Sequence, residues 1–253
     1  MAQDRPVIRV VADAAAVARE AAGALQHAVA AAVAARGRAA VALSGGSTPR
    51  RLLALLADAD QPYRAALPWH ALHLFWGDER HVPPDHADSN YRMTREALLD
   101  SGLVPEANVH RVPAEDPDAG HAAGRYQAEL AAFFAPAPGA LPRFDVVLLG
   151  MGADGHTASL FPGTDALDET EKWVTATYVE KFSAHRITLS FPVINAARQV
   201  LFLVTGADKA ETLAAVLEGA RRPKELPSQS VRPAPGDLVW LVDGAAARGL
   251  TTS

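Results

Sequence analysis

The chain has 253 residues, of which 49% are hydrophobic and 21% charged, which is close to ordinary usage in globular proteins. A formal net charge of −5 gives no general basic surface for nucleic acid or anionic lipid, and the absence of cysteine excludes disulfides, thiol nucleophiles and Cys-ligated zinc. We find no secretion signal and no stretch long and apolar enough for a membrane span. We therefore expect a cytoplasmic protein, a monomer or small homo-oligomer, without nucleic-acid or membrane partners.

The first third of the chain predicts two strands and two helices. Alternating residues at 7–11 predict a short strand, and the Ala-rich stretch 14–35 predicts a helix that ends at Gly37. Residues 39–43 form a compact apolar strand. The motif SGGSTPR, residues 44–50, joins this strand to the start of the next helix. A glycine turn thus follows a buried strand early in the chain.

The middle of the chain contains a strand followed by a long polar segment. Residues 70–76 predict the strand, and the run GDERHVPPDHADSNYR at 77–92 is too polar and too interrupted by proline for regular structure. We therefore expect a long loop there, and loops of this length are often functional. Three further elements are then expected: a helix over 91–99, a short strand over 109–112, and an amphipathic helix over 120–134.

The stretch 144–163, FDVVLLGMGADGHTASLFPG, contains a buried strand that ends in a glycine-rich turn. Beyond it we expect a strand pair over 173–178 and 186–191, a strand over 199–205, a helix over 208–217, and a last strand over 238–242. Because strands alternate with helices, the sequence predicts a layered α/β fold with a mostly parallel sheet. The chain has no internal repeat, and we expect one domain over residues 1–253.

The glycine-rich turn matches the G-x-G-x-x-G pattern of dinucleotide sites, but three features oppose that interpretation. Pro162 and Gly163 would end the following helix after about a turn and a half, too short for a helix that faces a pyrophosphate. Asp154 would place a carboxylate beside the diphosphate, and the pattern lies past the middle of the chain. Asp154 and His156, two residues apart, instead indicate a catalytic turn, with a purely structural turn as the alternative.

The earlier glycine turn has the features of a phosphate site. Gly45 and Gly46 can expose backbone N–H groups at a helix N-terminus, where peptide dipoles favour an anion. Hydroxyl groups of Ser44, Ser47 and Thr48 add donors. The alternative is a capped helix start, with Ser47 or Thr48 as the cap and Pro49 in the first turn.

The polar segment 77–92 supplies further candidates for ligand binding. Arg80 is suited to bind a phosphate with two hydrogen bonds, and Asp78 and Asn90 are polar neighbours in sequence. The histidines and aspartates of the segment do not have the spacing of a metal site, so no metal is predicted. Arg186 and Lys209 add positive charge further along the chain. A solvated polar loop and ordinary surface cations are the alternatives.

Three motifs together resemble those of the 6-phosphogluconolactonase family: SGGSTP, GDERHVP followed by SNYR, and LLGMGADGHTASLFPG. The segments RITLSFPVINAA and VTGADKAETL continue the likeness along nearly the whole chain. The resemblance implies a three-layer, Rossmann-like α/β fold with helices on both faces of a mostly parallel sheet and a small antiparallel portion. It also implies hydrolysis of 6-phospho-D-glucono-1,5-lactone to 6-phosphogluconate in the oxidative pentose phosphate pathway, with no cofactor.

The resemblance also implies roles for the candidate residues. His156 matches the family's catalytic histidine and would act as the base for a water molecule, with Asp154 orienting its ring. The substrate phosphate would lie on the turn at 45–48, with Arg80, Arg186 and Lys209 as cationic partners. Asp78 and Asn90 would bind sugar hydroxyls or hold the loop.

Two rival functions remain open at this point. An amino-sugar phosphate isomerase or deaminase resembles this chain in its glycine turn, but such an enzyme needs a carboxylate base over the sugar. We would expect D-E-Y where this chain has Asp78-Glu79-Arg80, and A-F-N-E-P where it has the five residues ASLFP at 158–162. A sugar-phosphate sensor would need an output module, for which we see no spare length.

Overall fold

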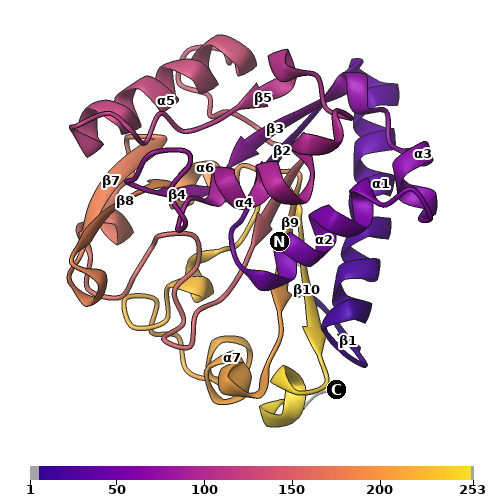
Figure 1. Cartoon of the computed structure of the whole chain (residues 1–253). Helices are drawn as coiled ribbons and strands as arrows, with labels where there is room; N and C mark the ends of the chain where they lie inside the picture. The colour runs from indigo at the N-terminus through magenta and orange to yellow at the C-terminus, as the bar shows by residue number, and fades with distance from the viewer. Residues whose placement is uncertain (1–5, 252–253) are drawn as a thin grey trace.

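The computed structural model describes residues 6–251, with a seven-stranded sheet at its centre (Figure 1). All neighbouring strands in this sheet are parallel, in the order β1-β10-β9-β6-β2-β3-β5. The strands are β1 (Val7–Val11), β2 (Ala39–Leu43), β3 (Leu72–Trp76), β5 (Val109–His110), β6 (Val146–Leu149), β9 (Gln199–Val204) and β10 (Asp237–Asp243). A smaller antiparallel sheet contains β4 (Asp78–Arg80), β8 (Ala184–Leu189) and β7 (Val174–Val179), in that order. The predicted sheet, mostly parallel with a small antiparallel portion, is confirmed.

Helices cover both faces of the large sheet and give three layers. In Figure 1, α1 (Ala14–Arg36), α2 (Ser47–Ala57) and α3 (Pro62–Ala66) lie on the right of the sheet, and α5 (Ala119–Phe134) lies on its other side together with the small sheet. The helices are α1 (Ala14–Arg36), α2 (Ser47–Ala57), α3 (Pro62–Ala66), α4 (Asn90–Ala97), α5 (Ala119–Phe134), α6 (Phe191–Asn195) and α7 (Ala210–Leu217). No helix within residues 6–251 combines the length and the apolar character that crossing a bilayer requires.

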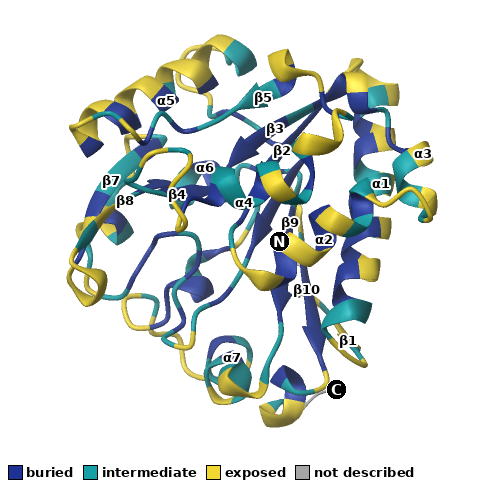
Figure 2. Cartoon of the chain, in the orientation of Figure 1, coloured by how far each residue is buried: buried dark blue, intermediate teal, exposed yellow. Residues whose placement is uncertain are grey.

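The core lies between these layers and explains the sequence patterns. Every residue of β2 and β6 is buried, as Figure 2 shows for the central strands, because helices cover both of their faces. The long helix α1 turns Val17, Leu25 and Val29 toward the core and ends at Gly37, as predicted. Its alanines leave little bulk between helix and sheet, so the helix can lie close to β2, β9 and β10.

The strand order places a crevice at the centre of the sheet. From β2 the chain continues to β3 and β5 toward one edge, whereas from β6 it continues to β9 and β10 toward the other. The two strands β2 and β6 are parallel neighbours, so the direction in which successive strands are added to the sheet reverses between them. Open α/β sheets bind ligands at this kind of point, beyond the carboxyl ends of the strands. Both predicted glycine turns begin there.

The structure corrects two predictions about local structure. The segment 77–92 is not one irregular loop, because its first residues form β4, which pairs with β8 about a hundred residues later, and α4 already begins at Asn90. No helix follows β6, since residues 150–163 form turns with an isolated bridge between Thr157 and Leu160. The second correction removes the helix that a dinucleotide site would need. The short helices α3 and α6 were not predicted, and the other elements differ from prediction by a few residues at their ends.

Candidate active site

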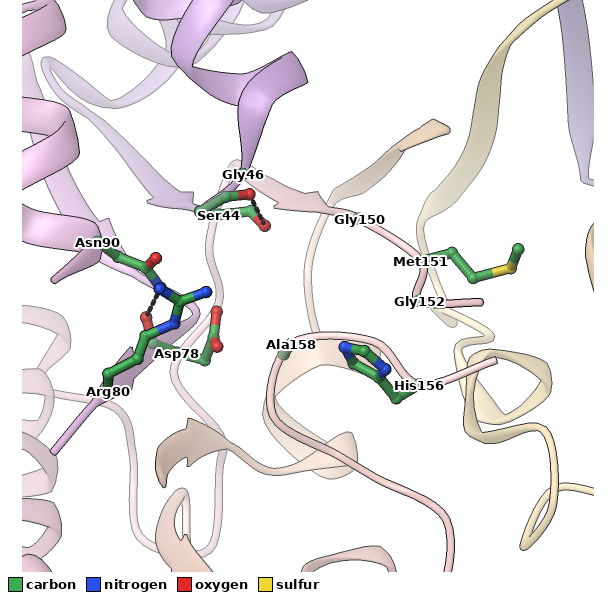
Figure 3. A pocket seen from close by; sticks show the side chains of 11 residues that line it. Ser44, Gly46, Asp78, Arg80, Asn90, Gly150, Met151, Gly152, His156 and Ala158 are labelled. Atoms are coloured by element: carbon green, nitrogen blue, oxygen red, sulfur yellow. Dashed lines mark hydrogen bonds between the residues drawn. The ribbon is translucent and has the colours of Figure 1, made fainter. Parts of the chain in front are cut away.

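A pocket lies beyond the carboxyl ends of β2 and β6, where three segments of the chain meet (Figure 3). The first is the turn after β2, the second is β4 with the start of α4, and the third is the turn after β6. The lining residues are Ser44, Gly45, Gly46, Asp78, Arg80, Asn90, Gly150, Met151, Gly152, His156 and Ala158. The two glycine turns therefore share one pocket although about a hundred residues separate them in sequence.

His156 is held by the carboxylate of Asp154. Its Nδ1 atom forms a hydrogen bond with Asp154 Oδ1, and the Asp154 carboxylate also accepts from the backbone N–H of His156 at 3.3 Å. The bond from the imidazole, with a contribution from Lys181, holds the pKa of Asp154 well below its usual range. Because an ionised carboxylate only accepts, Nδ1 carries the proton of the neutral ring, and the lone pair is on Nε2. Nε2 is then the atom that can accept a proton.

Two neighbours fix the plane of the imidazole. Phe161 stacks on the ring with 4.0 Å between the centroids and an interplanar angle of 27°. A Cβ atom at Gly152 would lie 2.1 Å from both Cε1 and Nδ1 of His156. Only glycine leaves room for the ring at that position. The glycine turn thus serves to bring an imidazole against the backbone, which the G-x-G-x-x-G spacing alone does not reveal.

Buried hydrogen bonds join β4 to Ser159 and to the start of α4, and two of the bonded residues, Asp78 and Asn90, line the pocket. Asp78 Oδ2 accepts a hydrogen bond from Ser159 Oγ at 2.7 Å, and Asn90 Nδ2 donates to the backbone oxygen of Asp78 at 2.9 Å. Between them in sequence, Glu79 is 2% exposed and accepts from the backbone N–H groups of Asn90 and Tyr91 at the start of α4. Burial raises the pKa of Glu79. Glu79 is therefore a structural link between β4 and α4, while Asp78 lines the pocket.

Two arginines lie next to each other beside the pocket. Arg80 lines it, and Arg186 is its partner across the antiparallel pair of β4 and β8. Burial, followed by repulsion from Arg80, lowers the pKa of Arg186. Within residues 6–251 neither guanidinium forms an ion pair with a carboxylate; Arg80 donates instead to the backbone oxygen of Asp88. An anion placed between the two arginines would relieve their repulsion.

The other predicted site residues lie outside the pocket lining. Ser47 is exposed in the first turn of α2, and the buried Thr48 hydroxyl instead bonds Thr205 Oγ1 at 2.8 Å. Neither caps the helix, since Gly46 is the N-cap residue. Lys209 forms an ion pair with Asp208 at 2.7 Å. Asp154 stands behind His156 as its partner.

The pocket also contains residues that the sequence did not single out. Met151 and Ala158 line it, and Ala158 has a φ of 49°, in the left-handed region that non-glycine residues seldom adopt. No sequence signal predicts that alanine conformation. Among residues 6–251, no three His, Asp or Glu side chains are grouped as metal ligands would be.

Comparisons with known proteins identify the family of this chain. Residues 12–240 match the family described as glucosamine-6-phosphate isomerases/6-phosphogluconolactonase. A 6-phosphogluconolactonase from Synechocystis is 45% identical over 219 residues, covering 87% of this chain and 88% of the relative. The solved 6-phosphogluconolactonase from Trypanosoma cruzi has a TM-score of 0.84 at 32% identity, covering 98% of this chain and 97% of that chain.

A solved monomeric glucosamine-6-phosphate deaminase has a TM-score of 0.77 at 18% identity, covering 96% of this chain and 100% of that one. That likeness shows the fold alone. The resemblance inferred from the sequence motifs is confirmed by the family match and by the identity to the curated relatives. The chain therefore belongs to the family of glucosamine-6-phosphate isomerases and 6-phosphogluconolactonases, and within it to the 6-phosphogluconolactonases.

Proposed function

We propose that this protein hydrolyses 6-phospho-D-glucono-1,5-lactone to 6-phospho-D-gluconate, the second step of the oxidative pentose phosphate pathway, with His156 activating the attacking water. One observation carries the proposal: His156, with Nδ1 bonded to Asp154, lies in the same pocket as the glycine turn of α2 and Arg80. A base and an anion-binding wall thus share one cavity. The proposal includes a cytoplasmic location and a monomer or small homo-oligomer, as predicted from the sequence.

The chemistry requires a base, an oriented water and donors for the developing negative charge. Nε2 of His156 takes a proton from water, which then attacks the lactone carbon, and Asp154 stabilises the imidazolium that forms. Because a lactone is an activated ester, no covalent intermediate and no cofactor is needed in this proposal. The proton passes from imidazolium to the ring oxygen as the ester bond breaks.

The substrate phosphate would bind on the opposite side of the pocket. Gly45 and Gly46 precede the first turn of α2, where N–H groups and the helix dipole attract an anion. Arg80 lines the same cavity, and Arg186 lies beside Arg80. Asp78 lies between Arg80 and His156 in the lining, and Asn90 lies beside Arg80 (Figure 3); both would accept from or donate to sugar hydroxyls. Lys209 would contribute only after leaving Asp208.

The rival function is deamination or isomerisation of an amino-sugar phosphate, and Asp78 is the observation that favours it. A carboxylate in the pocket is the kind of base that moves a proton between C1 and C2. However, Asp78 Oδ2 already accepts a hydrogen bond from Ser159. At the position where the rival motif A-F-N-E-P has its acidic residue, this chain has Phe161, which stacks on His156. Both contacts favour hydrolysis.

The decisive experiment is an assay of lactone loss against its spontaneous background. The wild-type protein is expected to accelerate it, and His156→Ala to lower kcat about 10²–10⁴-fold, the usual contribution of a general base. His121→Ala is the matched control, because His121 forms a comparable pair with Asp116 at 2.7 Å on the exposed surface of α5. It should retain wild-type activity.

Two results would overturn the proposal. Near-normal turnover in His156→Ala would remove the histidine from its role as base. Ammonia release from glucosamine 6-phosphate, without acceleration of lactone loss, would assign the protein to the deaminase reaction instead.

A further inference from the structure

The turn between β7 and β8 reaches the proposed catalytic histidine through two side chains. It is a short 3-10 helix, Glu180–Phe182, and both Lys181 and Phe182 are largely exposed, at 61% for the lysine side chain and 47% for the phenylalanine. An exposed phenylalanine at the tip of a hairpin contributes little to a core. Its position needs another explanation, which the neighbouring contacts supply.

Lys181 contacts the partner of the histidine. Its Nζ atom lies 3.2 Å from Asp154 Oδ2, while Asp154 Oδ1 accepts from His156 Nδ1. The carboxylate therefore stands between an ammonium group and the imidazole, with one oxygen directed at each. Removing the lysine would leave that carboxylate able to rotate and to interact more strongly with the imidazole alone.

Phe182 contacts the aromatic support of the histidine. Its ring meets the edge of Phe161 with 5.7 Å between centroids at 71°, and Phe161 stacks on His156. On another side, the Phe182 ring faces the guanidinium of Arg186 at 5.2 Å. One side chain in the turn thus contacts both the support of the base and an arginine of the proposed phosphate wall.

We infer that the turn Glu180–Phe182 is a positioning element for the site, in which Lys181 orients Asp154 and His156 while Phe182 supports Phe161 and Arg186. This inference rests on the proposed function, because it assigns how the base of that reaction is held. Lys181 and Phe182 are positioning residues, since they act through Asp154 and Phe161 and line no part of the pocket.

The charges around His156 determine the expected pH effect. Asp154 contacts the imidazole, and Lys181 contacts Asp154 from the turn. Asp78 and Arg80 of β4 line the same pocket. Arg186 of β8 lies beside Arg80. Removing the Lys181 cation leaves the Asp154 carboxylate to stabilise the imidazolium more strongly. The base is then lost to protonation at higher pH, so the acid limb of the activity profile moves upward.

The first test compares Lys181→Met with Lys181→Arg. Lys181→Met is expected to lower kcat about 10-fold, because a slightly misplaced base is costly, and to change KM less than about 2-fold. Lys181→Arg keeps the cation and should restore most of kcat. Lys172→Met is the matched control, as it removes the same charge from an exposed residue just before β7.

The second test removes the aromatic contact. Phe182→Ala is expected to lower kcat and raise KM together, because it removes support from both Phe161 and Arg186. Tyr178→Ala is the control, since Tyr178 is equally exposed on the same hairpin at 49% but contacts His185 instead. It should leave both constants near the wild-type values.

A measurement without substrate separates this inference from the proposed function. The NMR titration of the His156 ring, assigned by its loss in His156→Ala, should have a midpoint at higher pH in Lys181→Met than in wild type or Lys172→Met. If wild-type protein accelerates lactone loss but Lys181→Met matches Lys172→Met in kcat and titration, the inference fails and the proposed function stands. If the wild-type protein does not accelerate lactone loss, the proposed function fails. If, in addition, the titration midpoint of His156 is the same in Lys181→Met and wild type, the positioning role of Lys181 fails as well.

Discussion

At the scale of single residues, the site depends on how closely an imidazole approaches the backbone. Gly152 contributes no side chain, and the space it leaves is filled by the ring of His156 and by Asp154, whose Oδ1 would lie 2.7 Å from an added Cβ atom. Phe161 stacks on a face of the ring. The orientation of Nε2 therefore follows from the contacts of the ring with Gly152, Asp154 and Phe161.

Gly152→Ala should displace the imidazole. A Cβ atom 2.1 Å from the ring cannot be accommodated, so His156 must rotate, and kcat for lactone hydrolysis is expected to fall about 10²-fold. Gly124→Ala is the control, because no atom lies within 4 Å of a Cβ there and alanine favours the helix α5. Steady-state kinetics measures kcat for both variants, and thermal unfolding shows whether both are folded. Equal kcat values in the two folded variants would contradict the displacement of the imidazole.

Asp154→Asn should lower the free energy of unfolding by an amount that depends on pH, and this difference from wild type is the stability gap. The folded state holds the pKa of Asp154 below its ordinary value of about 3.9, so the carboxylate stabilises the fold above that pH. This contribution is lost as the pH falls through the lowered value of the folded state. Urea unfolding at several pH values should show a gap at neutral pH that narrows in acid, unlike the exposed control Asp168→Asn. A gap that stays constant into strong acid would refute the coupling.

At the scale of elements, the pocket is assembled from strand ends and the starts of the segments that follow them. The turn after β2 leads into α2, β4 runs into the chain leading to α4, and the turn after β6 has no helix of its own. Glu79 fixes the junction of β4 and α4, with both carboxylate oxygens accepting backbone or hydroxyl donors. Asp78 and Asn90 are thereby held on the same wall of the pocket.

Glu79→Gln should destabilise this junction. A glutamine has only one acceptor oxygen, so buried N–H donors at the start of α4 lose their partner, at a cost of about 2–4 kcal/mol in the free energy of unfolding. The exposed Glu96→Gln on α4 itself removes a surface pair with Arg92 and should cost much less, because solvent screens an exposed ion pair. Urea unfolding of both variants measures the difference. Equal losses would show that the buried contacts carry no special weight.

At the scale of the whole molecule, the strand order brings the two glycine turns together. Neighbouring parallel strands β2 and β6 end at the same edge of the sheet, so their turns open into one crevice. The small antiparallel sheet adds Arg80 and Arg186 as direct neighbours at this edge. His156, which follows β6 of the large sheet, and the two arginines of the small sheet thus come from different parts of the fold.

Product binding should stabilise the whole chain through Arg80. At a concentration of 6-phosphogluconate about 100 times its Kd, linkage predicts that the free energy of unfolding rises by about 2.7 kcal/mol and that Tm rises by roughly 5–10 °C. Arg80→Met should lose most of this rise, whereas Arg19→Met on the exposed side of α1 should keep it. Thermal unfolding with and without ligand provides the readout. An undiminished rise in Arg80→Met would remove that arginine from the phosphate site.

The sequence by itself determined the layered α/β fold, the parallel sheet and the family, because apolar strand runs and the motifs at 44–50 and 150–163 are local patterns. It did not reveal β4, since Asp78–Arg80 is a strand only through its pairing with β8. Nor did it show that Thr48 bonds to Thr205, or that Lys181 contacts Asp154. These depend on which distant segments meet, and the burial and pairing of the folded chain decide that.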